Sequence, residues 1–300
     1  MNIEPDHKTG MSKLDYFIEN NLQNYSRDRN YDFGPDNRNN ISLLSPYISH
    51  RTLFEYDIVK SCLKKYKFDQ VEKFIQEIFW RVYWKGWLEL RPSVWTDFCD
   101  NYQSIEQSNF YKKTIDGNTG IMCFDEWVIE LKEKNYLHNH ARMWFASIWI
   151  FTLRLPWQLG AAFFMEHLYD GDPASNTLSW RWVAGIQTKG KHYLARSANI
   201  SKFTNQRFQY TQLTTNADPI LEDKNFELKQ LDFKNLEIRY ENLIIFDSNL
   251  NTQELLDISG KYKTVYFVLF DNSSRKIKLS HRVTCFKESI VKSVSKLITN

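Results

Sequence analysis

The sequence predicts a mainly α-helical fold that is followed by a small α/β segment. Apolar residues recur at helical spacing through the first two thirds of the chain, and few alternating strand patterns occur before residue 215. Beyond that position, the runs NLIIFDSNL and TVYFVLFD are rich in β-branched and aromatic residues. This change of pattern divides the chain into residues 1–215 and residues 216–300, with a polar linker at 214–225.

Five segments carry the helical prediction in the first part. Residues 13–25 and 68–90 place apolar side chains three and four positions apart, and the second segment suits an amphipathic helix of about 20 residues. Residues 124–137 and 139–155 give two further helical patterns. A Gly-Asp-Pro break at 171–173 precedes SNTLSWRWVAG, which can start the fifth helix.

The second part predicts a strand–helix–strand–helix order. TQELLDISGKY is a short helical pattern between the two strand-like runs, and KESIVKSVSKL is a closing helix. This order is typical of a βαβ unit. The segment has no GxGxxG fingerprint and is short for a full dinucleotide-binding unit, so no nucleotide site is expected in it.

Composition excludes several classes of protein. The net charge is only +3, so no global field indicates a nucleic-acid or membrane partner, although a local groove could still be basic. The start MNIEPDHKTGMSK lacks the apolar stretch of a secretory signal, which predicts a cytoplasmic protein. The most apolar stretch, residues 143–157, is interrupted by Arg154 and Pro156 and is shorter than the roughly 20 residues of a bilayer span. It is expected to be a buried helix.

The aromatic content of 16%, with ten Trp, exceeds what a core of this size needs. The cysteines, by contrast, predict no special chemistry, because they are widely spaced with neither CxxC nor CxxH. Buried thiols in a reducing compartment are expected, with no metal site and no disulfide framework. The cysteines are Cys62, Cys99, Cys123 and Cys285.

A first cluster of chemically interesting residues lies within the segment 68–90. Glu77, Trp80 and Arg81 are spaced i, i+3 and i+4, so they share one helix face. A Trp between a carboxylate and a guanidinium can form a platform for a flat heterocycle. A half-buried Trp beside an ordinary surface ion pair is the alternative.

A second cluster follows at the start of the segment 139–155. His138 and Arg142 are spaced i, i+4, and so are Asn139 and Met143, so two adjacent stripes would reach the same cavity. His138 and His140 point apart on a helix, which argues against a metal site. An ordinary polar helix end is the alternative.

Two further clusters lie close together. Asp170 and Asp172 flank a glycine, where they can cap a helix, hold an arginine or accept a hydrogen bond from a ring N–H. Trp180 and Trp182, with Trp157 upstream, cannot face one another on one helix, so each must touch something different.

Taken in order, these clusters resemble the helical FAD-binding domain of the photolyase/cryptochrome flavoproteins over residues 13–205. YSRDRN followed by SLLSPY resembles the family's phosphate loop, and EIFWRVYW resembles its E-L-I-W-R-E-F-Y helix. YLHNHARM resembles W-M-H-N-R-x-R-M, and YDGDPASNTLSWRWVAG resembles I-D-G-D-x-A-x-N-x-x-x-W-x-W. The resemblance implies a helical photolyase-type fold for residues 1–215 and FAD as the cofactor.

The resemblance also implies which residues hold FAD. The diphosphate region would be bound by Tyr25, Ser42, Leu44 and Ser45. The flavin would be surrounded by Arg81, His138, Asn139, Arg142, Asp170, Asp172 and Asn176. Within this set, Arg142 would pair with Asp170, and Asn176 would face flavin N5.

Catalytic roles follow from the same resemblance. Glu77, Trp80 and Trp182 would contact a damaged pyrimidine pair. Trp180 and Trp157 would be the inner members of an electron-transfer chain. Photolyases for (6-4) photoproducts carry histidines at the positions of Asn139 and Met143 and need proton transfer, so the cyclobutane dimer is the expected lesion. Phosphate contacts are expected from Arg29, Lys189, Lys191 and Arg196, which could equally be ordinary surface cations.

The resemblance therefore implies a short, monomeric photolyase that repairs cyclobutane dimers in single- or double-stranded DNA by light-driven electron transfer from reduced FAD. A cryptochrome-like light or redox sensor is the main alternative, and a catalytic subunit with a separate antenna chain is another. Four departures stand out. The family's amino-terminal α/β antenna domain is not recognisable, Ser104 stands where the outermost Trp belongs, with Tyr102 a nearby candidate, and His140 replaces an arginine. The usual final helices of the FAD-binding domain are not recognisable after about residue 215.

Overall fold

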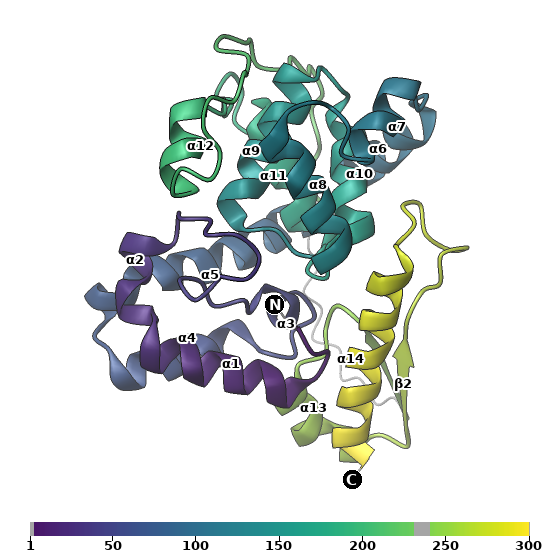
Figure 1. The fold of residues 1–300 in the computed structure, drawn as a ribbon. Coiled ribbons are helices and arrows are strands. Elements are labelled where there is room, and N and C mark those ends of the chain that lie inside the picture. Colours follow the sequence, from purple (N-terminus) through teal and green to yellow (C-terminus); the bar gives the residue numbers. More distant parts are fainter. Residues whose placement is uncertain (1–2, 231–240, 300) are drawn as a thin grey trace.

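The computed structural model describes residues 3–230 and 241–299. These residues are mainly helical with two short strands, which confirms the predicted fold class (Figure 1). Helices α1–α5 form one group, α6–α12 form a second group above it, and the carboxyl-terminal elements lie beside the first group (Figure 1). None of the described helices is both long and apolar enough to cross a bilayer.

The helices and strands have the following bounds. The α-helices are α1 (His7–Asn20), α2 (Tyr25–Asp28), α3 (Ser45–Ser49), α4 (Glu55–Lys65), α5 (Phe68–Glu89), α6 (Pro92–Ser104), α7 (Asn109–Ile115), α8 (Met122–Lys134), α9 (Asn139–Ser147), α10 (Trp157–His167), α11 (Pro173–Ala184), α12 (Ser197–Phe203), α13 (Thr252–Ile258) and α14 (His281–Thr299). The shorter turns are the 3-10 helices η1 (Leu22–Asn24) and η3 (Ser259–Lys261) and the π-helix η2 (Ile148–Thr152). The strands are β1 (Asn242–Phe246) and β2 (Thr264–Val268).

Helix α5 matches the amphipathic helix predicted over residues 68–90. Val71, Phe74, Ile75 and Ile78 are buried at spacings of three and four, which places them on one face. The opposite face keeps aromatic side chains, among them Trp80, exposed to solvent. The helix therefore supplies both a core stripe and an exposed aromatic surface.

Two predicted helices have different bounds in the structure. The helix expected at 13–25 begins earlier, at His7, because Asp6 caps it by accepting from the Thr9 N–H at 2.8 Å, and it also ends earlier, at Asn20. The prediction for 139–155 is wrong in its last turn, because the helical winding ends at Thr152 in η2. Arg154 has a φ of 54°, and the following Pro156 disfavours helix at the residue before it.

The larger hydrophobic core lies between α8, α9, α10 and α11. Trp127, Trp144, Trp149 and Trp180 are all buried in it. The helices approach closely, since a Cβ on Gly160 of α10 would lie 2.3 Å from the ring of Trp180 and 2.9 Å from that of Trp149. Several of the ten Trp are therefore core residues. Cys62, Cys99 and Cys123 are also buried, as expected, whereas Cys285 is exposed on α14.

The predicted strand–helix–strand–helix order is present in the carboxyl-terminal segment. Strands β1 and β2 pair in parallel with Asn242 opposite Thr264, and α13 lies in the crossover between them. This segment shares a second hydrophobic core with the amino-terminal helices, in which Ile245, Phe286 and Val294 join Leu14. The division of the chain at residue 215 stays a prediction.

The close approach at Gly160 makes a testable prediction. Gly160→Ala should destabilise the protein by about 1–3 kcal/mol, because the added methyl group overpacks the contact with Trp180. Gly86→Ala is the matched control, since a Cβ on Gly86 of α5 meets nothing within 4 Å. Ala there should stabilise the helix by up to about 1 kcal/mol. Urea unfolding of both variants measures the two changes, and equal effects would contradict the packing argument.

Candidate functional site

A cavity of about 480 Å³ opens between α5, α9 and α11. This volume is typical of small-molecule and cofactor sites. Of the predicted site residues, those lining it are Arg29, Glu77, Trp80, Arg81, Asn139, Arg142, Met143, Asp170, Asn176, Trp180 and Trp182. Residues from distant parts of the sequence thus meet around one space.

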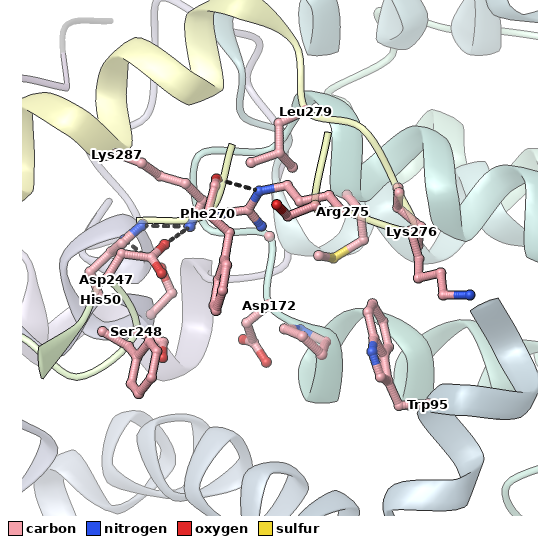
Figure 2. A pocket seen from close by; sticks show the side chains of 17 residues that line it. His50, Trp95, Asp172, Asp247, Ser248, Phe270, Arg275, Lys276, Leu279 and Lys287 are labelled. Atoms are coloured by element: carbon pink, nitrogen blue, oxygen red, sulfur yellow. Dashed lines mark hydrogen bonds and ion pairs between the residues drawn. The ribbon is translucent and has the colours of Figure 1, made fainter. Parts of the chain in front are cut away.

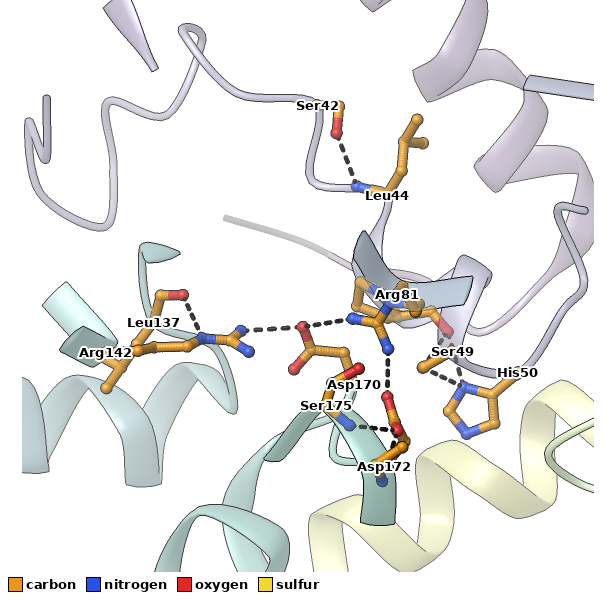
Figure 3. A network of polar contacts seen from close by, with 12 residues as sticks. Ser42, Leu44, Ser49, His50, Arg81, Leu137, Arg142, Asp170, Asp172 and Ser175 are labelled. Atoms are coloured by element: carbon orange, nitrogen blue, oxygen red, sulfur yellow. Dashed lines mark hydrogen bonds and ion pairs between the residues drawn. The ribbon is translucent and has the colours of Figure 1, made fainter. Parts of the chain in front are cut away.

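Arg81, Arg142 and Asp170, which line the cavity, belong to an ion-pair network that also includes Asp172, a predicted site residue outside the lining (Figure 3). Arg81 of α5 donates to Oδ2 of Asp172 at 2.5 Å, and Arg142 of α9 donates to Oδ2 of Asp170 at 3.0 Å. Arg142 also donates through Nε to the Leu137 carbonyl at 2.9 Å. Arg142 therefore pairs with Asp170 in the structure.

Asp170 is ionised in this network. Burial alone would favour its neutral form, but the guanidiniums of Arg142 and Arg81 outweigh that effect and hold the pKa of Asp170 below its ordinary value. Asp172 has a second task, since its Oδ1 accepts from the N–H groups of Ala174 and Ser175 at the start of α11. The two carboxylates therefore join α5, α9 and α11.

The mouth of the cavity carries an ion pair and exposed aromatic rings. Glu77 accepts from Arg29 at 2.6 Å. Trp80, beside it on α5, is 49% exposed and stacks on Trp84 with ring centroids 5.7 Å apart. Trp182 of α11 also lines the cavity and stacks on Tyr193 at 5.8 Å. Two indoles on separate helices thus border the opening.

His138 lies outside the lining of this cavity. It caps α9, where its Nδ1 accepts from the His140 N–H at 3.2 Å, and it is almost fully buried. Burial holds its pKa at about 3, so the imidazole is neutral. His140 stacks on Trp144 at 4.0 Å. These two histidines do not present a proton donor to the cavity.

The predicted phosphate-binding residues lie at the edge of the site. Tyr25 packs edge-on against Phe74 at 5.1 Å, and burial raises its pKa. Ser42 accepts from the Leu44 N–H at 3.4 Å, and Figure 3 shows this turn in the same view as the Arg81–Asp172 pair. Ser45 begins α3. None of these four lines the cavity, and their role stays a prediction.

Trp180 is buried beside the cavity and lines it. Its ring meets Trp149 edge-on at 6.1 Å, whereas Trp157 stacks on Phe98 at 5.4 Å. No sequence pattern singles out Trp149, because it lies in an apolar run where every residue is a core candidate. Among the described residues, Trp149 is thus an indole in ring contact with Trp180.

The remaining predicted cations do not line the cavity. Lys189 and Lys191 are exposed in the turn that follows α11, and Arg196 is exposed before α12. Arg29, by contrast, reaches the mouth and pairs with Glu77. Contacts of these residues with a phosphate backbone stay a prediction.

Comparison with known proteins identifies the domain that carries this cavity. Residues 74–212 match the family model described as the FAD binding domain of DNA photolyase. This part of the chain is similar to the photolyase family. The cofactor of the photolyase-type domain is FAD.

Individual relatives agree with this assignment. A deoxyribodipyrimidine photo-lyase of Agrobacterium fabrum is 30% identical over 188 residues, which are 60% of this chain and 38% of that protein. A bacterial class III photolyase of Agrobacterium tumefaciens superimposes with a TM-score of 0.57 at 27% identity, over 67% of this chain and 43% of that one. A Synechocystis cryptochrome shares the fold, with a TM-score of 0.59 at 22% identity over 67% and 44% of the two chains. The chain spans less than half the length of these proteins.

The residues of the cavity fit FAD. Three buried polar atoms that line it have no hydrogen-bond partner among the described residues, namely Oδ1 of Asp170, Oγ of Ser175 and Nε1 of Trp180. Buried polar atoms normally have partners, so these atoms suit a ligand with both donors and acceptors. The flavin ring and ribityl hydroxyls of FAD offer both.

The buried imidazole of His138 predicts a loss of stability at acidic pH. Its pKa is about 3 in the folded chain, against 6.5 ordinarily, so between these values only the unfolded chain binds the proton. The free energy of unfolding should therefore fall below pH 6.5, by up to about 1.4 kcal/mol per pH unit from this group.

Urea unfolding at about pH 7 and about pH 5 measures this dependence. His138→Gln should make it shallower by the contribution of one proton, whereas His281→Gln, at an exposed position, should leave it as in the parent protein. An unchanged dependence in His138→Gln would contradict the assignment.

Proposed function

We propose that this chain is a light-dependent DNA-repair flavoprotein that splits cyclobutane pyrimidine dimers. The observation that carries the proposal is that the half-exposed Trp80 and the ion-paired Glu77 lie side by side at the mouth of the cavity. The same cavity is also lined by Arg81, Asp170 and Asn176. A flavin protein that only senses light needs no such opening for a pyrimidine dimer.

Trp80 and Trp182 are proposed to hold the dimer. Enzymes that act on a base inside a duplex extrude it into a pocket, and aromatic rings there replace the lost stacking. Trp80 is well placed to do so, because one face of its ring is supported by Trp84 while half of its surface remains exposed. Stacking of a base on an aromatic ring contributes about 1–3 kcal/mol.

Glu77 is proposed to orient the dimer. An ionised carboxylate only accepts hydrogen bonds, and the imide N–H of a pyrimidine is a matching donor. Arg29 at 2.6 Å and Lys73 at 3.6 Å both pair with Oε1 of Glu77, which leaves Oε2 for this contact among the described residues. The guanidinium of Arg29 is then close enough to the opening to meet a phosphate of the same strand.

Reduced FAD, when bound, supplies under light the electron that opens the cyclobutane ring and receives it back. The chain's own residues must then avoid unwanted proton transfer. Asn139 and Met143, which line the cavity, do not titrate near neutral pH, and His138 lies outside the lining. This lining favours a cyclobutane dimer over a lesion whose repair requires a proton donor.

A repair assay with dimer-containing single- and double-stranded oligonucleotides tests the proposal. Illuminated protein should remove the dimer. Trp80→Ala should weaken dimer binding about tenfold or more through lost stacking. Phe79→Ala is the matched control, because Phe79 is equally exposed, at 49%, and does not line the cavity. FAD-loaded protein that leaves the dimer intact would contradict the repair function.

Photoreduction of bound FAD tests the electron path. Trp157→Phe should slow it, because the family resemblance implies that Trp157 is an inner member of the electron-transfer chain. Trp144→Phe should not, because Trp144 packs on Trp127 and His140 and the resemblance gives it no such role. The rate is followed by the loss of flavin absorbance under blue light. If Trp149→Phe slowed photoreduction and Trp157→Phe did not, the electron path would run through Trp149 and the role proposed for Trp157 would be wrong.

A further inference from the structure

A second cavity, of about 470 Å³, lies at the carboxyl edge of the parallel strands β1 and β2 (Figure 2). It is lined by the end of β1, by the loop that leads from β2 to α14, and by residues of α3, α6, α10, α11 and α14. Ligands of open α/β sheets bind outside this edge of the strands. The cavity is separate from the proposed repair site, although Gly171 lines both.

Aromatic rings form the walls of this second cavity. Phe246 ends β1, Phe270 follows β2, and their rings stack with centroids 5.9 Å apart and planes 17° from parallel. Both remain about half exposed. Trp95 of α6 lines the cavity as well, and Figure 2 shows Phe270, Asp172 and Trp95 in turn across the view. Such walls suit a flat aromatic ring.

The loop between β2 and α14 presents Arg275 to the cavity in a fixed position. Asp271 accepts from the Ser273 N–H at 2.7 Å, and Asn272 exchanges two hydrogen bonds with the backbone of Leu279. Within the part of the chain that the structure describes, Arg275 donates only its Nε, to the Phe270 carbonyl at 3.0 Å. Its two terminal nitrogens have no ion-pair partner among the described residues and are available to an anion.

The floor of the cavity is a buried polar cluster drawn from three elements. Lys287 of α14 donates to Oδ2 of Asp247 at 2.7 Å and lies 3.1 Å from Nε2 of His50. All three residues are buried and line the cavity. An ammonium has three donors, so Lys287 keeps one N–H without a partner among the described residues.

We propose that this cavity binds a mononucleotide, with the base against the stacked rings of Phe246 and Phe270 and the phosphate on Arg275 and Lys287. Lys276 is not counted, because its ammonium is 3.8 Å from Asp100 of α6. The proposal departs from the expectation that the carboxyl-terminal segment holds no nucleotide. That expectation rested on the missing glycine-rich loop, whereas this site uses side-chain cations in place of backbone N–H groups.

Isothermal titration calorimetry of the FAD-saturated protein with AMP tests the proposal. The protein is saturated with FAD because FAD contains an AMP moiety. Added AMP could otherwise bind in an unfilled FAD site and be counted as binding to the second cavity. AMP should bind at one site per chain. Adenosine, which lacks the phosphate, and inorganic phosphate, which lacks the ring, should each bind about tenfold more weakly or worse.

Three variants separate the contributions. Arg275→Gln should weaken AMP binding about tenfold and leave adenosine unchanged, because it removes a charge-assisted hydrogen bond. Phe270→Leu should weaken both ligands. Lys278→Gln is the matched control, since Lys278 is exposed on the same loop and does not line the cavity.

The result can overturn the proposal in two ways. AMP that binds no more tightly than inorganic phosphate would show an anion site without a base site. Equal affinities in Arg275→Gln and Lys278→Gln would place the ligand elsewhere. Neither outcome depends on whether the protein repairs DNA.

Discussion

The carboxylate of Asp172 is the contact on which the proposed repair site depends. One oxygen accepts from two N–H groups at the start of α11, and the other accepts from Arg81 of α5. The same side chain thus begins one helix and ties it to another. Trp80 on α5 and Trp182 on α11 face one opening because this contact sets how far apart the two helices stand.

The neighbouring Asp170 adds an electrostatic cost to this arrangement. Two carboxylates so close together would repel each other, and burial adds to the cost of keeping both charged. Arg81 and Arg142 offset this cost, and Arg81 lies within 3.9 Å of Asp170 as well as bonding Asp172. Loss of one guanidinium would leave a buried charge without its partner, which typically costs about 3–5 kcal/mol.

Local patterns explain why some of this was predictable from the sequence. Helix α5 follows from the spacing of Val71, Phe74, Ile75 and Ile78, and the pairing of Arg142 with Asp170 follows from a family resemblance. Helix α10 gave no amphipathic signal, because nearly every residue from Trp157 to Met165 is buried. The second cavity could not be predicted from local sequence patterns, because it brings together side chains as distant in sequence as His50 and Lys287.

The core shared by the two ends of the described chain bears on how the protein is made. Leu14 of α1 and Val294 of α14 belong to the same cluster, so the apolar face of α1 has no complete partner until α14 has been synthesised. Contacts between residues so distant in sequence form late, because the intervening loop must close first. During synthesis on the ribosome, the apolar surface of the first helices therefore stays exposed until α14 is complete. A chaperone that covers this surface would raise the yield of folded protein.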